Sequence, residues 1–209
     1  VLGRFVRLAG GFKLVLMGDE SKSVVSNGRI SMTEKGMDCG LFCWGNDDGP
    51  GKKKYHLLLE GAKFADTHGF SAIWTPERHF HAFGGPYPNP SVTGAAVAAV
   101  TKNIAVRSGS CVAPLHHPLR IAEEWAVIDN LTEGRAGLAI AAGWQPDDFV
   151  LRPENAPPAN KPAMYESLQH LPKLWRGEPG SFHNASGKDV AVVPQPRPVL
   201  AELPILVTT

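Results

Sequence analysis

From residue 37 onward, short apolar runs alternate with amphipathic helical segments, and no other feature of the chain restricts the fold as much. The runs that we expect to form strands are residues 37–44, 71–75, 104–112, 136–141 and 204–208. The segments that we expect to form helices are residues 55–68, 91–100, 119–131 and 163–176. Nearly continuous apolar strands separated by helices are typical of a parallel sheet, so the pattern predicts an α/β fold.

Two α/β architectures fit this order, an open doubly wound sheet and a (β/α)₈ barrel. The first strand–helix turn has no G-x-G-x-x-G, so a dinucleotide-binding Rossmann opening has no support. The long loops 76–90, 113–118 and 143–162 all follow strands, and in a barrel such loops meet at the face where active sites are built. We therefore predict a TIM-type (β/α)₈ barrel that is incomplete, with only about five of the eight strands present.

Residues 1–36 show a different pattern from the rest of the chain. Residues 12–18 and 24–28 have the character of short strands, but no helix of useful length joins them. We interpret residues 1–36 as a linker or a remnant of an upstream domain, and residues 37–209 as the N-terminal part of the barrel.

Composition argues against several classes of partner. The chain has 21 basic and 20 acidic residues and a net charge of +1, so it has no general attraction for nucleic acid or for an anionic membrane. No stretch approaches the roughly 20 apolar residues of a membrane helix. The three cysteines, Cys39, Cys43 and Cys111, have no paired spacing, which indicates reduced thiols in a cytoplasmic protein.

The loop after the second predicted strand is rich in side chains that can do chemistry. Glu77, Arg78, His79 and His81 lie three to seven positions after Trp74. Such groups at the carboxyl end of a strand can bind an anion or exchange protons near neutral pH. The alternative is an ion-paired anchor in which Glu77 holds Arg78 or another cation.

Two further loops carry weaker signals. Gly109 and Ser110 are small residues within an apolar strand, where glycine often marks a bulge or the close approach of a flat ligand. Gly143 and Trp144 follow the fourth predicted strand, and the indole could stack on a planar cofactor or close the rim of the barrel. Neither pattern separates ligand binding from tight packing.

An ordered series of motifs resembles one known family. The motifs are Trp-Thr-Pro-Glu-Arg-His-Phe (74–80), Tyr-Pro-Asn-Pro (87–90), Pro-Leu-His-His-Pro-Leu-Arg (114–120), Glu-Glu-Trp-x-x-x-Asp-Asn-Leu (123–131), Gly-Arg (134–135) and Gly-Trp-x-Pro-Asp-Asp-Phe (143–149). Together they resemble the luciferase-like monooxygenases, and more narrowly the branch associated with nonribosomal-peptide and polyketide assembly lines.

The resemblance implies a TIM-type barrel that binds FMN, receives it reduced from a separate reductase and uses O₂ as co-substrate. It also implies a non-prolyl cis peptide against the flavin, which aligns with Gly109-Ser110. The residues that we expect to contact the cofactor are Gly109, Ser110, Trp74, Gly143 and Trp144.

The same resemblance suggests His79 and Arg78 as catalytic residues. Bacterial luciferase has two adjacent histidines after its second strand, and only the second has a counterpart here, at His79. The role of the first histidine therefore does not transfer to Arg78, whose fixed positive charge would instead stabilise an anionic oxygen species or flavin.

The predicted function is that of an FMN-dependent monooxygenase domain that oxygenates a small or carrier-protein-bound acyl or aminoacyl substrate in natural-product biosynthesis. The expected partners are that substrate, a flavin reductase and a second copy of the chain in a homodimer. Two alternatives stay open: a non-catalytic truncated fragment, because the family's phosphate-binding loop would begin near Thr209, and a metal-dependent hydrolase barrel that uses His79 and His81. We expect no metal, because residues 136–141 supply no further ligand.

Overall fold

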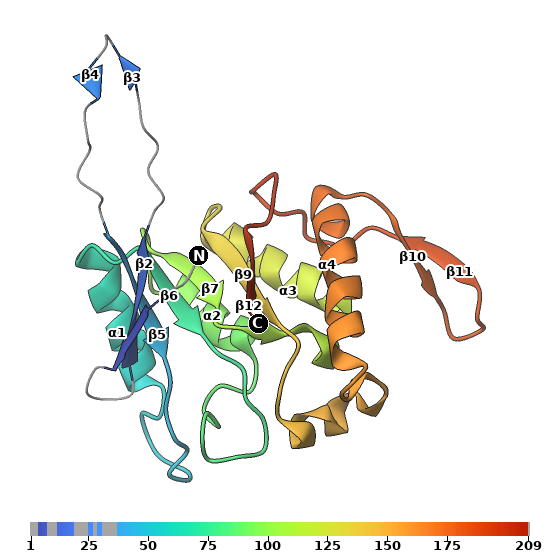
Figure 1. Cartoon of the computed structure of the whole chain (residues 1–209), viewed down its shortest axis with the longest axis horizontal. Helices are drawn as coiled ribbons and strands as arrows, with labels where there is room; N and C mark the ends of the chain where they lie inside the picture. The colour runs from blue at the N-terminus through green and yellow to red at the C-terminus, as the bar shows by residue number, and fades with distance from the viewer. Residues whose placement is uncertain (1–3, 8–11, 19–24, 27–28, 31–36, 209) are drawn as a thin grey trace.

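The computed structural model describes residues 4–7, 12–18, 25–26, 29–30 and 37–208 of the chain. Its main sheet has eight strands in the order β1-β2-β5-β6-β7-β9-β12, with β8 pairing β9 (Figure 1). The strands that run parallel to their neighbours are β5 (Met37–Cys43), β6 (Ala72–Thr75), β7 (Ala105–Ser108), β8 (Cys111–Val112), β9 (Ala136–Ala141) and β12 (Ile205–Thr208). Four of the predicted strands are confirmed as single strands, and the third forms as two, β7 and β8. The parallel order of these strands agrees with the predicted incomplete barrel.

Antiparallel strands cover the other edge of β5. Strand β2 (Phe12–Gly18) pairs with β5 over its whole length, from Phe12 opposite Cys43 to Gly18 opposite Met37. Strand β1 (Arg4–Arg7) pairs with β2 in turn, and β3 (Val25–Ser26) pairs with β4 (Arg29–Ile30) in a separate sheet. The strand expected at residues 12–18 is confirmed. Of the strand expected at 24–28, residues 25–26 form β3 and the others lie outside the described residues. The domain division at residue 36 stays a prediction.

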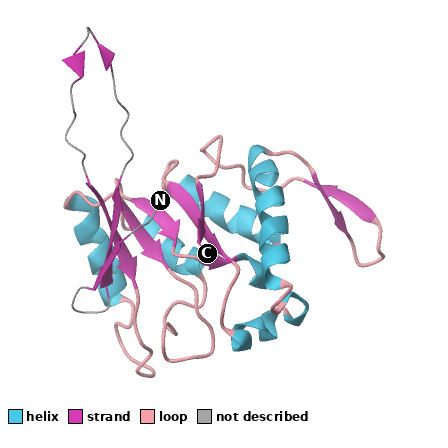
Figure 2. Cartoon of the chain, in the orientation of Figure 1, coloured by secondary structure: helices cyan, strands magenta, loops and turns pink. Residues whose placement is uncertain are grey.

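Helices cover one face of the parallel sheet. They are α1 (His56–Thr67), α2 (Pro90–Ala98), α3 (Pro118–Leu131) and α4 (Asn160–Arg176), and Figure 2 shows α4 to the right of the strands. Helix α3 turns an apolar stripe toward the sheet, with Ile121, Trp125 and Ile128 almost fully buried. These side chains belong to a core that also includes Ile73 and Leu138 from the strands. Because their helical spacing brings them onto one face, the helix gains stability mainly from packing.

The opposite face of the sheet corresponds to the inside of a barrel. Trp74 lies there with Ala72 and Ala139, and Phe42 and Leu206 pack against them. This buried cluster is smaller than the one on the helix-covered face. The loops at the carboxyl ends of the strands lie at the edge of this face in a barrel, and a barrel enzyme builds its site there.

Two further elements complete the chain. Strands β10 (Gly180–His183) and β11 (Asp189–Val192) form an antiparallel hairpin that projects from the body beyond α4 (Figure 1). Helix α4 ends at Gly177, whose φ of 87° is in the left-handed region that glycine adopts without steric cost. None of the helices in the described ranges is long and apolar enough to cross a membrane.

Candidate functional site

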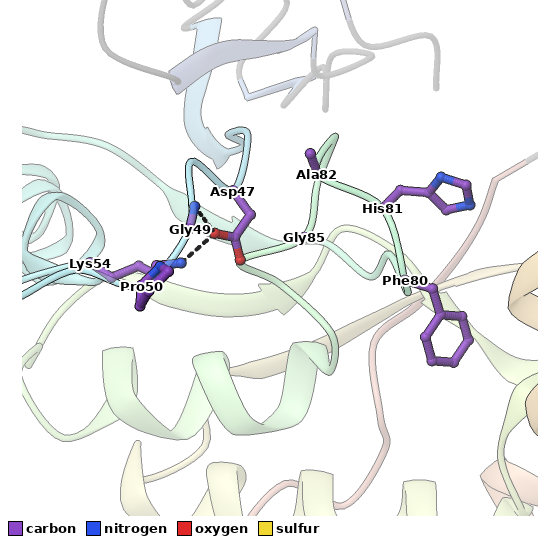
Figure 3. Close-up of a pocket in the computed structure, with 8 residues that line it drawn as sticks. All are labelled: Asp47, Gly49, Pro50, Lys54, Phe80, His81, Ala82 and Gly85. Atoms are coloured by element: carbon purple, nitrogen blue, oxygen red, sulfur yellow. Dashed lines mark hydrogen bonds and ion pairs between the residues drawn. The ribbon is translucent and has the colours of Figure 1, made fainter.

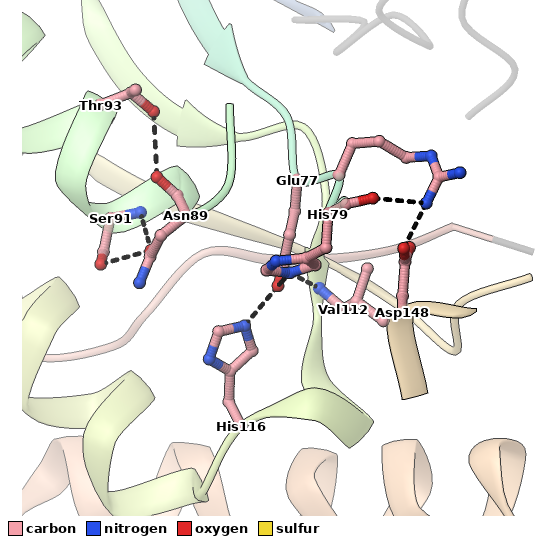
Figure 4. Close-up of polar contacts among 9 residues, drawn as sticks. Glu77, His79, Asn89, Ser91, Thr93, Val112, His116 and Asp148 are labelled. Carbon is pink, nitrogen blue, oxygen red and sulfur yellow. Dashed lines mark hydrogen bonds and ion pairs between the residues drawn. The ribbon is translucent and has the colours of Figure 1, made fainter. Parts of the chain in front are cut away.

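A buried carboxylate organises the loops at the carboxyl ends of β6 and β8. Glu77 Oε1 accepts hydrogen bonds from His79 Nε2 at 2.9 Å and from His116 Nε2 at 2.6 Å. Its other oxygen, Oε2, accepts the backbone N–H of Val112 at 2.6 Å (Figure 4). The Glu77 side chain is completely inaccessible to solvent. The interpretation of Glu77 as an anchor agrees with this geometry, although its partners are histidines and a backbone amide.

The charges of this network favour an ionised Glu77 beside a protonated His116. Burial alone raises the pKa of Glu77, but hydrogen bonds from His116 and His79 outweigh burial and lower the pKa below 4.5. Burial likewise lowers the pKa of His116, but the hydrogen bond to Glu77 outweighs it and raises the pKa above 6.5. The hydrogen bond between Glu77 and His116 thus contributes to both pKa shifts, and Glu77 also holds His79 in place.

Arg78 lies in a second buried pair. Its Nη1 donates to Asp148 Oδ1, and both side chains are at least nine-tenths buried. Nη1 also donates to the carbonyl of His79 at 3.3 Å, and the Trp144 ring centroid lies 5.4 Å from Arg78 Cζ. Its Nε is buried and has no partner among the described residues. The positive charge that we expected to act on an oxygen species is thus balanced by a carboxylate from the loop after β9.

The peptide bond between Gly109 and Ser110 is cis, as the resemblance predicts. A Cβ on Gly109 would lie 2.8 Å from Cε2 of Phe42 and 3.0 Å from Cβ of Trp74, so only glycine fits without displacing them. Ser110 Oγ lies 2.8 Å from Thr208 Oγ1 at the end of β12. Contact of Gly109 and Ser110 with a cofactor stays a prediction.

The other predicted cofactor residues lie in different environments. Trp74 is buried on the inner face of the sheet, with the Arg107 guanidinium carbon 5.3 Å from its ring centroid. Gly143 has a φ of 78°, and a Cβ there would lie 2.7 Å from Cγ1 of Val112. Trp144 is 72% exposed. The structure thus separates a buried inner tryptophan from a rim tryptophan.

The two histidines of the alternative metal site diverge. His79 turns to Glu77, whereas His81 Nε2 lies 3.3 Å from Asp147 Oδ2. His81 lines a wide hollow of about 480 Å³ with Asp47, Lys54 and Phe80 (Figure 3). Among the described residues, the ligand atoms that cluster closely enough for an ion belong to Glu77, Cys111 and His116. Burial raises the pKa of the Cys111 thiol well above 9.0. The thiolate that binds metals is therefore disfavoured, so this side chain is a poor metal ligand.

Some functional contacts escape sequence reasoning. Asp148 is buried against Arg78, which lies 70 positions earlier in the chain. The sequence did not indicate the contact of Arg107 with Trp74. Its position in a strand does not show whether its side chain faces the inside of a barrel. The ordered loop motifs were the one signal for His116, which follows the third predicted strand.

Comparison with known proteins gives the family. The family model described as Luciferase-like monooxygenase matches residues 37–209. The chain belongs to this family. The oxygenase component of the flavin-dependent trigonelline monooxygenase of Acinetobacter baylyi is 32% identical over 129 residues, which are 61% of this chain and 35% of that protein.

Solved structures show the same fold as this luciferase-like chain. The monooxygenase RslO1 of Streptomyces bottropensis is 28% identical with a TM-score of 0.67, covering 76% of this chain and 50% of that one. The oxygenating constituent of 3,6-diketocamphane monooxygenase of Pseudomonas putida, solved with FMN, is 24% identical with a TM-score of 0.62, covering 76% and 48%. The luciferase-like chain therefore spans about half the length, or less, of these relatives.

Proposed function

We propose that this chain forms the flavin-binding half of an FMN-dependent monooxygenase, which takes reduced flavin from a separate reductase and oxygenates a small or carrier-bound substrate in natural-product biosynthesis. The proposal rests on the Glu77 network, which holds His79 on the loop after β6 in a chain of the luciferase-like family. Reduced FMN would supply the electrons and the activation of O₂.

We place the flat ring of the flavin on the inner face of the sheet. Gly109 and Gly143 keep the backbone close at the ends of β7 and β9, and the hydroxyls of Ser110 and Thr208 lie together there. A ring above these residues would pack on backbone and small side chains, as planar cofactors do in largely apolar sites. These residues, with Trp144 at the rim, would hold the cofactor.

The protein's own groups would position and protect the reacting atoms. Because Nε2 of His79 donates to the Glu77 carboxylate, its Nδ1 is the atom able to hold or accept a proton from substrate or flavin. Trp144 over the Arg78–Asp148 pair would help to exclude water from this corner of the site. The pairing of Arg78 favours a role in holding the loop over direct contact with an oxygen species.

The experiment is a fluorescence titration of FMN with the purified chain, of the wild type and of His79→Gln, with His183→Gln as control. His183 is an exposed histidine on the projecting hairpin whose Nδ1 faces Asp189 at 2.9 Å, so it tests the loss of a paired imidazole away from the site. We expect the wild type and the control to bind FMN alike. With a reductase and a carrier loaded with an aminoacyl group, turnover should add one oxygen atom to the substrate and should fall about a hundredfold or more in His79→Gln.

Three results would overturn the proposal. A folded chain that binds no FMN would support the non-catalytic fragment. Binding of a deazaflavin in place of FMN would assign another cofactor class. Stoichiometric zinc with hydrolytic activity lost in His81→Gln would support the hydrolase alternative.

A further inference from the structure

A second hollow lies outside the sheet, on the helix-covered side of the loops. It has a volume of about 170 Å³ and lies where the N-terminus of α3, the middle of α4 and strand β10 meet. The lining residues used in the argument are His116, His117, Arg152 and Phe182, together with the acidic Glu166. Its volume suits a small ligand and is far too small for a flavin, so its occupant differs from the proposed cofactor.

The side chains around this hollow present hydrogen-bond donors. Nδ1 of His117 accepts the backbone N–H of Leu119 at 3.2 Å, so the neutral ring carries its proton on Nε2 and is a donor. His116 uses Nε2 on Glu77, and when protonated it has a second N–H at Nδ1. Arg152 contributes a guanidinium group.

The basic groups act on one another across the hollow. Burial first, and then the charges of Arg152 and His170, lower the pKa of His117. The charge of Arg152 also opposes protonation of His116. Arg152 thus brings positive charge to the hollow, and the N-terminus of the 14-residue helix α3 adds a partial positive charge.

One acidic residue, Glu166, lines this hollow, and Glu77 and Glu154 lie outside its lining. Glu77 contacts His116 from the opposite, fully buried side. Glu154 pairs with Arg152 as an exposed partner, and Glu166 lies 3.9 Å from His170 Nε2 with its side chain 73% exposed. Such exposed pairs contribute little and are easily exchanged, so Arg152 can turn to a ligand at small cost.

We propose that this hollow binds a small oxyanion, a phosphate or carboxylate group, between Arg152, His117 and His116. The oxyanion would accept from the guanidinium group and from the two imidazole N–H groups, all charge-assisted or partly buried. Phe182, whose ring centroid lies 5.2 Å from that of His117, would close the apolar side. The site is separate from the proposed flavin site and shares with it only the His116–Glu77 contact.

Calorimetric titration with inorganic phosphate, and separately with acetate, tests the proposal on the wild type, Arg152→Gln and Arg176→Gln. Arg176 is a matched control, because it makes the same kind of exposed pair with the residue two positions later, Glu178, at 2.8 Å. We expect phosphate to bind the wild type and Arg176→Gln alike, and about tenfold or more weakly in Arg152→Gln. The acetate titration shows whether a carboxylate suffices.

Nuclear magnetic resonance of the histidine side chains gives a second measurement. Bound phosphate should raise the pKa of His117, because an anion would offset the charges that now lower it. The proposal fails if no phosphate binds at millimolar concentration, or if Arg152→Gln binds it as well as Arg176→Gln does. It also fails if the pKa of His117 does not change when phosphate is added. These outcomes are independent of FMN binding, so the proposed function can fail separately.

Discussion

Replacing Glu77 by glutamine should destabilise the fold strongly, since this side chain accepts from three donors in a dry site. The amide group of the introduced glutamine would place a further donor against either the two histidines or the N–H of Val112. One buried donor is then left without an acceptor, at about 1–3 kcal/mol. Loss of the charge-assisted contact with His116 adds about 1.5–3 kcal/mol. Together these give an expected loss of about 2.5–6 kcal/mol in the free energy of unfolding.

The same change should alter how stability depends on pH. The pKa of Glu77 is lowered from 4.5, so its contribution is present above that pH and is lost as pH falls through the lowered value. The pKa of His116 is raised from 6.5, so its contribution is full below that pH and is lost as pH rises through the raised value. The pair thus stabilises the fold most between these limits. Above pH 6.5 the wild type should lose the contribution of the His116–Glu77 contact, whereas the glutamine variant lacks this contribution at every pH.

The assay is urea unfolding followed by tryptophan fluorescence at about pH 5.5 and about pH 8.5. Glu60→Gln is the control, because Glu60 pairs with Lys63 on the surface with its side chain 50% exposed. We expect Glu60→Gln to follow the wild type at both pH values and Glu77→Gln to unfold at much lower urea with a flatter pH dependence. The reasoning is refuted if both variants unfold alike, or if Glu77→Gln keeps the wild-type pH dependence.

Three further substitutions test other buried contacts. Asp129→Ala should cost about 3–5 kcal/mol by urea unfolding, because Oδ2 of this fully buried side chain accepts two backbone N–H groups of the loop before β12; a loss under about 1 kcal/mol would contradict this. Arg78→Met should cost about 3–5 kcal/mol by leaving Asp148 buried and unpaired, and adding Asp148→Leu should restore much of that; no recovery in the double variant would contradict it. Gly109→Ala should cost about 1–3 kcal/mol in thermal unfolding, since the new methyl group overlaps the ring of Phe42, and unchanged stability would contradict the packing.

Periodicity predicted the order of strands and helices because each parallel strand is apolar along its length and each helix has one buried face. Strand β9 has the predicted bounds, and α3 begins one residue before the predicted start, at Pro118. The third predicted strand was wrong as a single element, because the chain turns at Gly109-Ser110 and divides it into β7 and β8. That turn was visible in the resemblance and not in the hydrophobic pattern.

The candidate site was harder to predict than the fold. Its residues were placed correctly on the loops after β6 and β8, but their pairing depends on contacts between distant segments. Nothing local indicates that Glu77 receives His116 from 39 positions later. Nor does the strand pattern show that β2 lies against β5, because an antiparallel neighbour and a parallel one demand similar side chains.

The pairing of β2 with β5 makes completion of the barrel a competition for one edge. In a closed eight-stranded barrel the first strand has a parallel neighbour on each side, and here one of those sides of β5 is occupied by seven residues of β2. A closing strand would have to displace β2 residue by residue, with each backbone hydrogen bond exchanged for another. The incoming and outgoing strands would make equivalent backbone hydrogen bonds to β5. The free-energy difference between the two pairings would therefore depend on the side chains. The edge of β5 that β2 covers is thus the edge that a closing strand of a barrel would use.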